Sequence, residues 1–128
     1  MRERKYEGFL PGAHPIEAYG NGGFRFAGMS HRGSILALPS GIRTWRPAVA
    51  AEIDIASLAP LFEEPPGSVE HLLVGTGREI VPLPQDMRQR LREAGIRAEC
   101  MTTGAAAFTY SMLLGEKRRV AAALLAVP

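Results

Sequence analysis

The chain has almost no cysteine, and this scarcity limits both its chemistry and its compartment. Cys100 is the single cysteine among 128 residues, so no disulfide can form within the chain. Nothing therefore points to an oxidising compartment, where small domains depend on disulfides. A thiol nucleophile would need a nearby base, and no histidine neighbours Cys100 in the sequence. We expect Cys100 to be a buried, small apolar residue.

Long apolar runs are missing as well. The longest, residues 120–127, is far shorter than the roughly 20 residues that a membrane-spanning helix needs. Residues 1–7 are mostly charged and no apolar run follows them, which is not the pattern of a secretory signal. We therefore expect a cytoplasmic protein without a transmembrane segment. The sequence leaves open a peripheral association with a membrane.

Neither an excess of charge nor a catalytic motif stands out. The net charge is only +2 and aromatic residues make up 7%, whereas a nucleic-acid binder usually shows a basic stripe with interleaved aromatics. The densest arginines, residues 88–92 and 118–119, are interpreted as solvated surface. The histidines His14, His31 and His71 have no metal-ligand spacing. We expect no nucleic-acid partner, no metal, no cofactor and no catalytic residue.

The first half of the chain predicts an antiparallel meander. Residues 1–15 mix charges with glycine and proline and indicate an extended N-terminal arm. Alternating apolar residues then predict strands over 16–19, 24–29 and 34–38, separated by turns at 20–23 and 30–33. A further extended piece begins at Ile42, and a short helix is predicted to end near Phe62.

The second half predicts a βαβαβ unit with a parallel sheet. Strands are expected over 69–74, 96–101 and 119–127, with helices over about 85–94 and from Thr102 or Thr103 to about Leu114. The second of these helices is nearly apolar all round, which predicts burial on most sides. The fold class is thus α/β, or α+β by some schemes, with layered sheets flanked by helices. We expect one domain over residues 1–128.

The turn Gly75-Thr76-Gly77 lies at the carboxyl end of the central predicted strand, where open α/β sheets bind ligands. Its backbone N–H groups and the N-terminus of the helix at Thr102-Thr103 could form an anion-binding crevice, with Tyr110 nearby on that helix. A tight strand exit and an ordinary N-cap explain the same residues, and we favour them. Ile80 stands where a dinucleotide fingerprint would have its third glycine.

A series of short motifs over residues 14–126 resembles a known family. They are the glycine turn before Phe24-Arg25-Phe26, then Gly33-Ser34, Pro39, Trp45, Leu73 to Gly77, Gly95-Ile96, Glu99, Met101, Thr103, Ala106, Thr109-Tyr110 and Arg118 to Ala122. The chain resembles a domain-of-unknown-function family with an Mth-type α/β fold. This family includes a mitochondrial respiratory complex I assembly factor and an adipogenesis-associated cytosolic protein. Ser111 departs from the asparagine that many relatives carry, which puts a shared ligand in doubt.

The resemblance implies one α/β domain with two packed sheets, and no established catalytic activity. It also implies protein partners, including components of respiratory complex I assembly. The main hypothesis is therefore a non-enzymatic protein-binding or assembly factor. The alternative is a small-molecule or anion-binding protein, or a weak enzyme, that uses the crevice at Gly75, Thr76, Gly77, Thr102, Thr103 and Tyr110. Unpaired edge strands also leave a homo-oligomer open.

Overall fold

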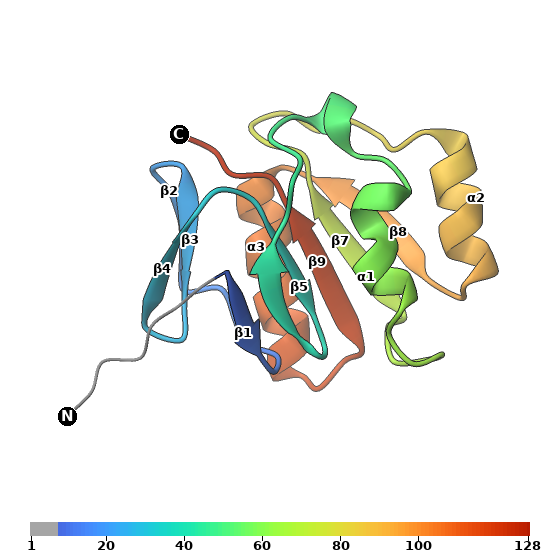
Figure 1. Cartoon of the computed structure of the whole chain (residues 1–128), viewed down its shortest axis with the longest axis horizontal. Coiled ribbons are helices and arrows are strands. Elements are labelled where there is room, and N and C mark those ends of the chain that lie inside the picture. The colour runs from blue at the N-terminus through green and yellow to red at the C-terminus, as the bar shows by residue number, and fades with distance from the viewer. Residues whose placement is uncertain (1–7) are drawn as a thin grey trace.

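A computed structural model describes residues 8–128 and shows two β-sheets with helices packed on them (Figure 1). The first seven residues of the expected arm lie outside the described part. The strands are β1 Phe9–Pro11, β2 Ala18–Gly20, β3 Gly23–Phe26, β4 Met29–Arg32, β5 Ile35–Leu38, β6 Gly41–Thr44, β7 His71–Gly75, β8 Arg97–Met101 and β9 Val120–Leu124. The α-helices are α1 Ala59–Phe62, α2 Gln85–Glu93 and α3 Thr103–Gly115, and two 3₁₀ helices, η1 Ala50–Glu52 and η2 Ala56–Leu58, precede α1.

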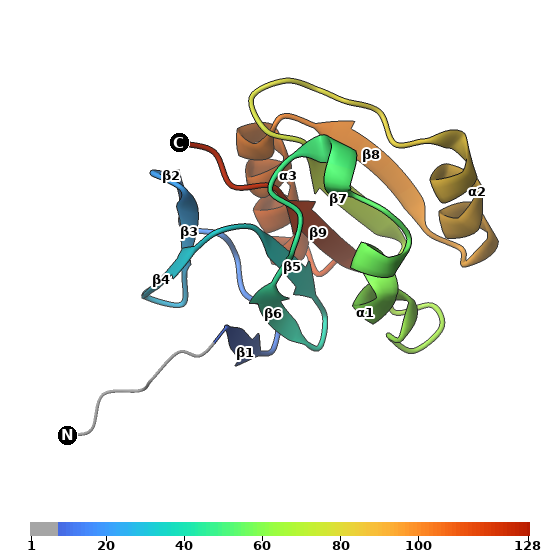
Figure 2. The same cartoon turned by 45° about the horizontal axis from the view of Figure 1, so that its top comes forward.

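The larger sheet has six strands in the order β1-β6-β5-β9-β7-β8. Strands β9, β7 and β8 are parallel, which confirms the predicted βαβαβ unit, and β9 joins it to the antiparallel β5. The chain crosses from β7 to β8 and then returns past β7 to β9. Because both crossovers are expected to be right-handed, the reversal of direction sends α2 and α3 to opposite faces of this sheet. Figure 2 shows the two helices on either side of β8 and β7.

The predicted meander divides between the two sheets. Strands β2, β3 and β4 form a separate antiparallel sheet, whereas β5 and β6 form a hairpin within the larger one. The expected turn over residues 30–33 is wrong, because Ser30 to Arg32 lie in β4. The chain instead turns at Ala27-Gly28, where both residues have positive φ, 51° and 73°. This pair of angles makes a type I′ hairpin, in which alanine is unusual.

Several predicted boundaries shift by a few residues. The last strand ends at Leu124 and not at Val127, and the central strand runs from His71 to Gly75. The helix from Thr103 begins as predicted, since Thr102 is its N-cap and its hydroxyl accepts from the N–H of Ala105 at 3.3 Å.

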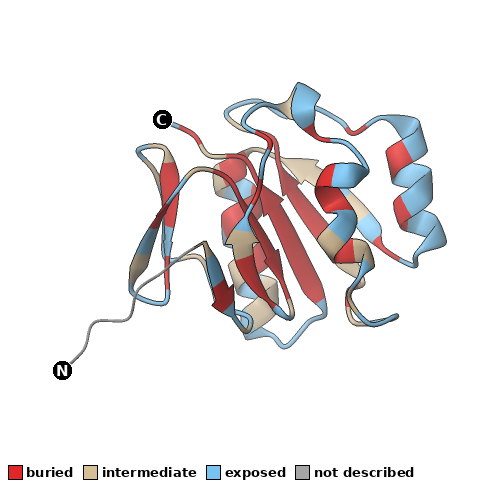
Figure 3. Cartoon of the chain, viewed as in Figure 1, coloured by how far each residue is buried: buried red, intermediate tan, exposed pale blue. Residues whose placement is uncertain are grey.

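Alternating side chains of the larger sheet divide the apolar interior into two cores. Leu72, Val74 and Ala123 face one core, which α1 and α2 close with residues such as Leu61, Met87 and Leu91. The opposite core lies between the sheet, α3 and the small sheet, and contains Phe24, Phe26, Ile35, Leu73, Ala106, Tyr110 and Leu124. Figure 3 shows the central strands buried while α2 exposes most of its length.

Ser111 links the start of the small sheet to α3. Its hydroxyl accepts from the N–H of Ile16 at 2.8 Å, just before β2, so one side chain of α3 holds the start of the small sheet. Tyr19 of β2 lies so close to Gly104 that any side chain at position 104 would meet its ring. Ser111 thus has a structural role in this chain.

Candidate functional site

The turn after β7 meets the N-terminus of α3, as the sequence predicted from their places in the topology. Thr76 is buried, and its hydroxyl donates to the carbonyl of Glu79 at 2.7 Å and accepts from the N–H of Val81 at 3.0 Å. The N–H of Thr76 donates to the carbonyl of Met101 at 2.9 Å. The polar groups of Thr76 are therefore used to shape the loop and to hold it against β8.

Thr103 links this turn to the end of β9. Its side chain is fully buried, and its hydroxyl accepts from the N–H of Gly77 at 3.0 Å and donates to the carbonyl of Leu125 at 2.7 Å. The N–H of Thr103 donates to the carbonyl of Gly77 at 2.8 Å. One threonine thus joins the carboxyl ends of β7 and β9 to the start of α3.

Gly75 allows this close approach. A Cβ atom at position 75 would lie 2.8 Å from the Cα of Thr103 and 3.0 Å from a methyl group of Leu124. Such distances are too short for real side chains, so the absence of a Cβ is what lets α3 start directly above the end of β7. Gly77 follows with a φ of 100°, which glycine adopts without strain.

Most of the predicted site residues therefore lie together, but their polar groups bind one another and the neighbouring backbone. Gly75, Thr76, Gly77 and Thr103 form a connected set of hydrogen bonds and backbone contacts, and Thr102 caps α3 beside them. A ligand that bound these N–H or hydroxyl groups would have to break existing hydrogen bonds. The arrangement favours a structural joint over an anion cradle, in line with the interpretation that the sequence favoured.

Tyr110 lies apart from these hydrogen bonds, in the core beneath α3. Its side chain is fully buried, and its hydroxyl has no hydrogen-bond partner among the described residues. Burial raises the pKa of Tyr110 well above its usual value near 10, so the phenol stays neutral at any physiological pH. A neutral, unpartnered phenol is not equipped for acid-base chemistry.

The remaining reactive side chains are scattered. Burial raises the pKa of the Cys100 thiol, which opposes formation of the reactive thiolate. Burial lowers the pKa of His31, whose Nε2 lies 3.2 Å from the carbonyl oxygen of Ser34. Across residues 8–128, no three His, Cys, Asp or Glu side chains are placed to hold a metal ion. Within the same residues, no helix is both long and apolar enough to cross a membrane.

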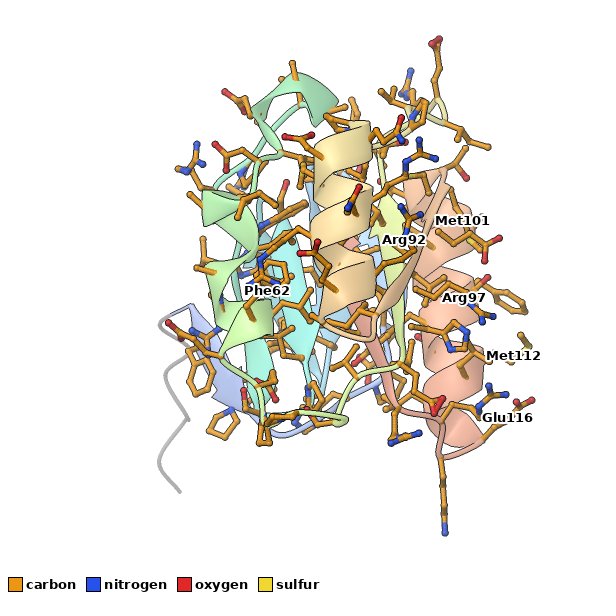
Figure 4. The ribbon with its side chains drawn as sticks, turned by 90° about the vertical axis from the view of Figure 1, so that its right-hand side faces the viewer. Phe62, Arg92, Arg97, Met101, Met112 and Glu116 are labelled. Atoms are coloured by element: carbon orange, nitrogen blue, oxygen red, sulfur yellow. The ribbon has the colours of Figure 1, made fainter. Side chains whose placement is uncertain are left out.

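The outer face of α3 was not anticipated. The expectation that this helix is buried on most sides is confirmed, with Ala106, Ala107 and Tyr110 in the core and Leu113 and Leu114 packed against it, but one stripe of the helix faces solvent. Phe108 is 70% exposed and Met112 is 47% exposed. Figure 4 shows Met112 pointing away from the sheet. We call Phe108 and Met112 the outer face of α3.

Comparison with known proteins gives consistent matches over most of the chain. The family described as "Protein of unknown function (DUF498/DUF598)" matches residues 16–125. An uncharacterised protein of Rhodobacter capsulatus is 42% identical over 117 residues, which cover 91% of this chain and 88% of that protein. A Xenopus tropicalis protein named NADH dehydrogenase (ubiquinone) 1 alpha subcomplex assembly factor 3 is 32% identical over 110 residues, or 86% of this chain. The match spans only 60% of that assembly factor.

Solved structures share the fold. The crystal structure of an outer membrane protein from Bartonella henselae is 48% identical with a TM-score of 0.84, and the match covers 92% of this chain and 98% of that one. The solution structure of a Bordetella pertussis protein, described as an Mth938-like domain, is 29% identical with a TM-score of 0.76 and covers 98% of this chain and 92% of that one. These likenesses confirm the predicted α/β architecture.

Proposed function

The chain belongs to the DUF498/DUF598 family of proteins of unknown function, as the resemblance in its motifs predicted, and from this premise we propose that it is a non-enzymatic protein-binding module that assists the assembly of a larger complex. The single observation that carries this proposal is the exposed apolar outer face of α3. Crossover helices of soluble α/β proteins normally present polar side chains to water.

The outer face has the composition of an interface core. Phe and Met are enriched in protein interfaces, and a phenylalanine that is 70% exposed leaves most of its side chain in water. Full burial of such a side chain against a partner would contribute about 1.5–3 kcal/mol. The adjoining Ala105 is also exposed and lets a partner approach the helix backbone closely.

The names of the relatives indicate what kind of complex is concerned. Homologues from several vertebrates are named assembly factor 3 of NADH dehydrogenase (ubiquinone), and the match to the Danio rerio protein spans 64% of its length. By analogy, the partners of this chain are components of respiratory complex I assembly. We propose that it meets them from the cytoplasm, by peripheral contact where they lie at the membrane.

Binding of a small molecule or anion at Gly75 to Gly77, the alternative function, has less support. The polar groups of Thr76 and Thr103 already bind backbone groups of the protein, so a ligand has few unoccupied donors there. A thermal-shift screen with metabolite mixtures tests this alternative. A ligand whose stabilising effect disappears in Thr76→Val would revive it.

Affinity capture of the full chain from its native cells, quantified by mass spectrometry, tests the main proposal. The wild type is compared with Phe108→Glu and Met112→Glu, and with Val49→Glu, which changes a residue that is 55% exposed outside α3. We expect a specific partner that the wild type and Val49→Glu retain and that both α3 variants lose. Because all three positions are exposed, circular dichroism should show equal folding. Capture that is equal for all variants, or no partner above a control protein, would refute the proposal.

A further inference from the structure

Strand β8 ends the larger sheet and leaves one edge unpaired. The N–H of Arg97 donates to the carbonyl of Glu70 at 2.8 Å, and the carbonyl of Met101 accepts from the β7 side. Since backbone groups alternate along a strand, Ala98 and Cys100 turn their N–H and C=O groups to the opposite edge. Within residues 8–128, β7 is the only strand that pairs with β8. The five residues of β8 contain no proline, one of the common protections of a free edge.

A groove whose lining includes four arginines lies at the start of this edge. It has a volume of about 730 Å³ and extends from the outer side of α2, past the beginning of β8, to the chain just before β9. We call it the arginine groove; its charged and titratable lining residues are Arg88, Arg92, Arg97, Arg118, Glu70 and His71. Figure 4 shows Arg92 on α2 and Arg97 on β8 on this side of the molecule.

Among residues 8–128, the arginines of the groove form no ion pair with a carboxylate. In the part of the chain that the structure describes, the ion pairs join Arg25 to Glu17, Arg46 to Asp54 and Arg119 to Glu70. Glu70 carries the one carboxylate that lines the groove. It is already paired with Arg119, a residue that does not line the groove. The Nδ1 atom of His71 is buried and has no hydrogen-bond partner among the residues that the structure describes. The groove thus offers an excess of donors and positive charge.

Charged side chains near a sheet edge can simply deter pairing with other sheets. That explanation suits Arg97, which lies on the strand itself. It does not account for Arg88 and Arg92, which lie one turn apart on α2, or for Arg118, which precedes β9. Three separate segments converge on one groove beside unpaired backbone groups.

We propose that an extended acidic segment of a partner protein adds as a further strand to the free edge of β8, with its carboxylates bound by Arg88 and Arg92 on the α2 face of the sheet. Backbone hydrogen bonds to Ala98 and Cys100 supply affinity, and the arginines select the sequence. Guanidinium groups bind carboxylates in paired, charge-assisted hydrogen bonds. This inference rests on the proposed role in protein binding and names the chemistry of one partner segment.

The same charges disfavour a second copy of the chain as the occupant. Two β8 strands that pair antiparallel are related by a two-fold axis perpendicular to the sheet, which keeps both α2 helices on the same face. The Arg88 and Arg92 side chains of the two copies would then lie along one face of the joined sheet. Like charges brought together in this way destabilise the pairing.

The test measures binding of a fluorescein-labelled peptide of about seven alternating glutamates and valines, long enough for one strand. Fluorescence polarisation with the full chain is run at about 150 mM salt, where weak long-range attraction is screened. Three comparison peptides are used. The first has lysine in place of glutamate, and the second has the same residues with all glutamates in one block. The third carries N-methyl groups on its central backbone amides. Arg88→Glu/Arg92→Glu is compared with Arg32→Glu/Arg46→Glu, which changes the net charge equally at exposed positions outside the groove.

We expect saturable binding of the alternating acidic peptide, at least about tenfold weaker binding of each comparison peptide, and a similar loss in Arg88→Glu/Arg92→Glu only. Equal binding of the block or N-methylated peptide would overturn strand addition. Equal loss in both double variants would overturn the role of the groove. Binding of inorganic phosphate or citrate without binding of the peptide would assign the groove to small anions. A dimer in analytical ultracentrifugation that Arg88→Glu/Arg92→Glu abolishes would assign it to a second copy.

This proposal can fail while the role in protein binding stands. A partner captured from cells that is lost with Phe108→Glu but kept by Arg88→Glu/Arg92→Glu would refute strand addition at β8 alone. Absence of any captured partner, together with specific binding of the acidic peptide, would count against assembly and leave the groove as a peptide site.

Discussion

Replacing Thr103 by valine tests the structural role of the joint between β7, β9 and α3. Its fully buried hydroxyl accepts from Gly77 N–H at 3.0 Å and donates to Leu125 C=O at 2.7 Å. Valine keeps the shape and leaves both backbone groups without a partner. Each buried, unsatisfied group costs about 1–3 kcal/mol, and the extra methyl group recovers part of this. We expect the free energy of unfolding to fall by about 2–4 kcal/mol.

For a chain of this length, about 1 kcal/mol corresponds to about 4 °C in Tm, so Thr103→Val should melt about 8–16 °C below the wild type. Thermal and urea unfolding followed by circular dichroism measure the loss. Thr102→Val is the matched control, because its hydroxyl only caps α3 and its removal should cost about 1 kcal/mol. A Thr103→Val protein that melts within about 2 °C of the wild type, or no lower than Thr102→Val, would refute the structural joint.

Three further measurements test other parts of the account. Tyr110→Phe removes a buried hydroxyl that has no hydrogen-bond partner among residues 8–128, so calorimetry should show unchanged or higher stability, by up to about 1–3 kcal/mol. A clear loss of stability would reveal an unrecognised hydrogen bond. Burial raises the pKa of the Cys100 thiol, so iodoacetamide at pH about 8 should alkylate the folded chain at least about tenfold more slowly than the unfolded chain. Equal alkylation rates would contradict the burial of Cys100. Burial lowers the pKa of His31, so the imidazole takes up a proton more readily in the unfolded chain than in the folded one. The free energy of unfolding should therefore fall as the pH drops below about 6.5. The variant His31→Gln should show a smaller fall over the same pH range.

The local elements could be predicted because their signals lie within a few residues. The helix α2 follows Pro84 and ends before Gly95, and its buried Met87 and Leu91 are one turn apart. The strand pattern of the second half was equally clear, since β7 and β8 are each followed by a loop and a helix. These signals were sufficient for the parallel unit and the meeting of the two turns at Thr76 and Thr103.

Other features depend on contacts that no local pattern reports. The turn at Ala27-Gly28 was missed because alanine rarely adopts a φ of 51°, and Gly33 offered a stronger turn signal nearby. The outer face of α3 was missed because an apolar helix normally predicts burial on all sides. A crossover helix that covers one face of a sheet leaves at least one stripe in solvent, and on α3 this stripe contains Phe108 and Met112.

The arginine groove was beyond prediction for a similar reason. Arg88 and Arg92 are separated from Arg118 by a strand and a helix, and only the order of β9, β7 and β8 brings them to one side of the sheet. In the sequence they are ordinary surface charges. Their shared position beside an unpaired strand edge is a property of the topology.

We propose that this chain works by binding another protein at the outer face of α3. Quantitative affinity capture from native cells tests it most directly, with the wild type, Phe108→Glu and the exposed-site control Val49→Glu compared in one experiment. We expect one or more partners that the wild type and Val49→Glu recover equally. Recovery of these partners by Phe108→Glu should be at least about tenfold lower. Equal recovery of every partner by Phe108→Glu, in a protein that folds normally, would contradict it.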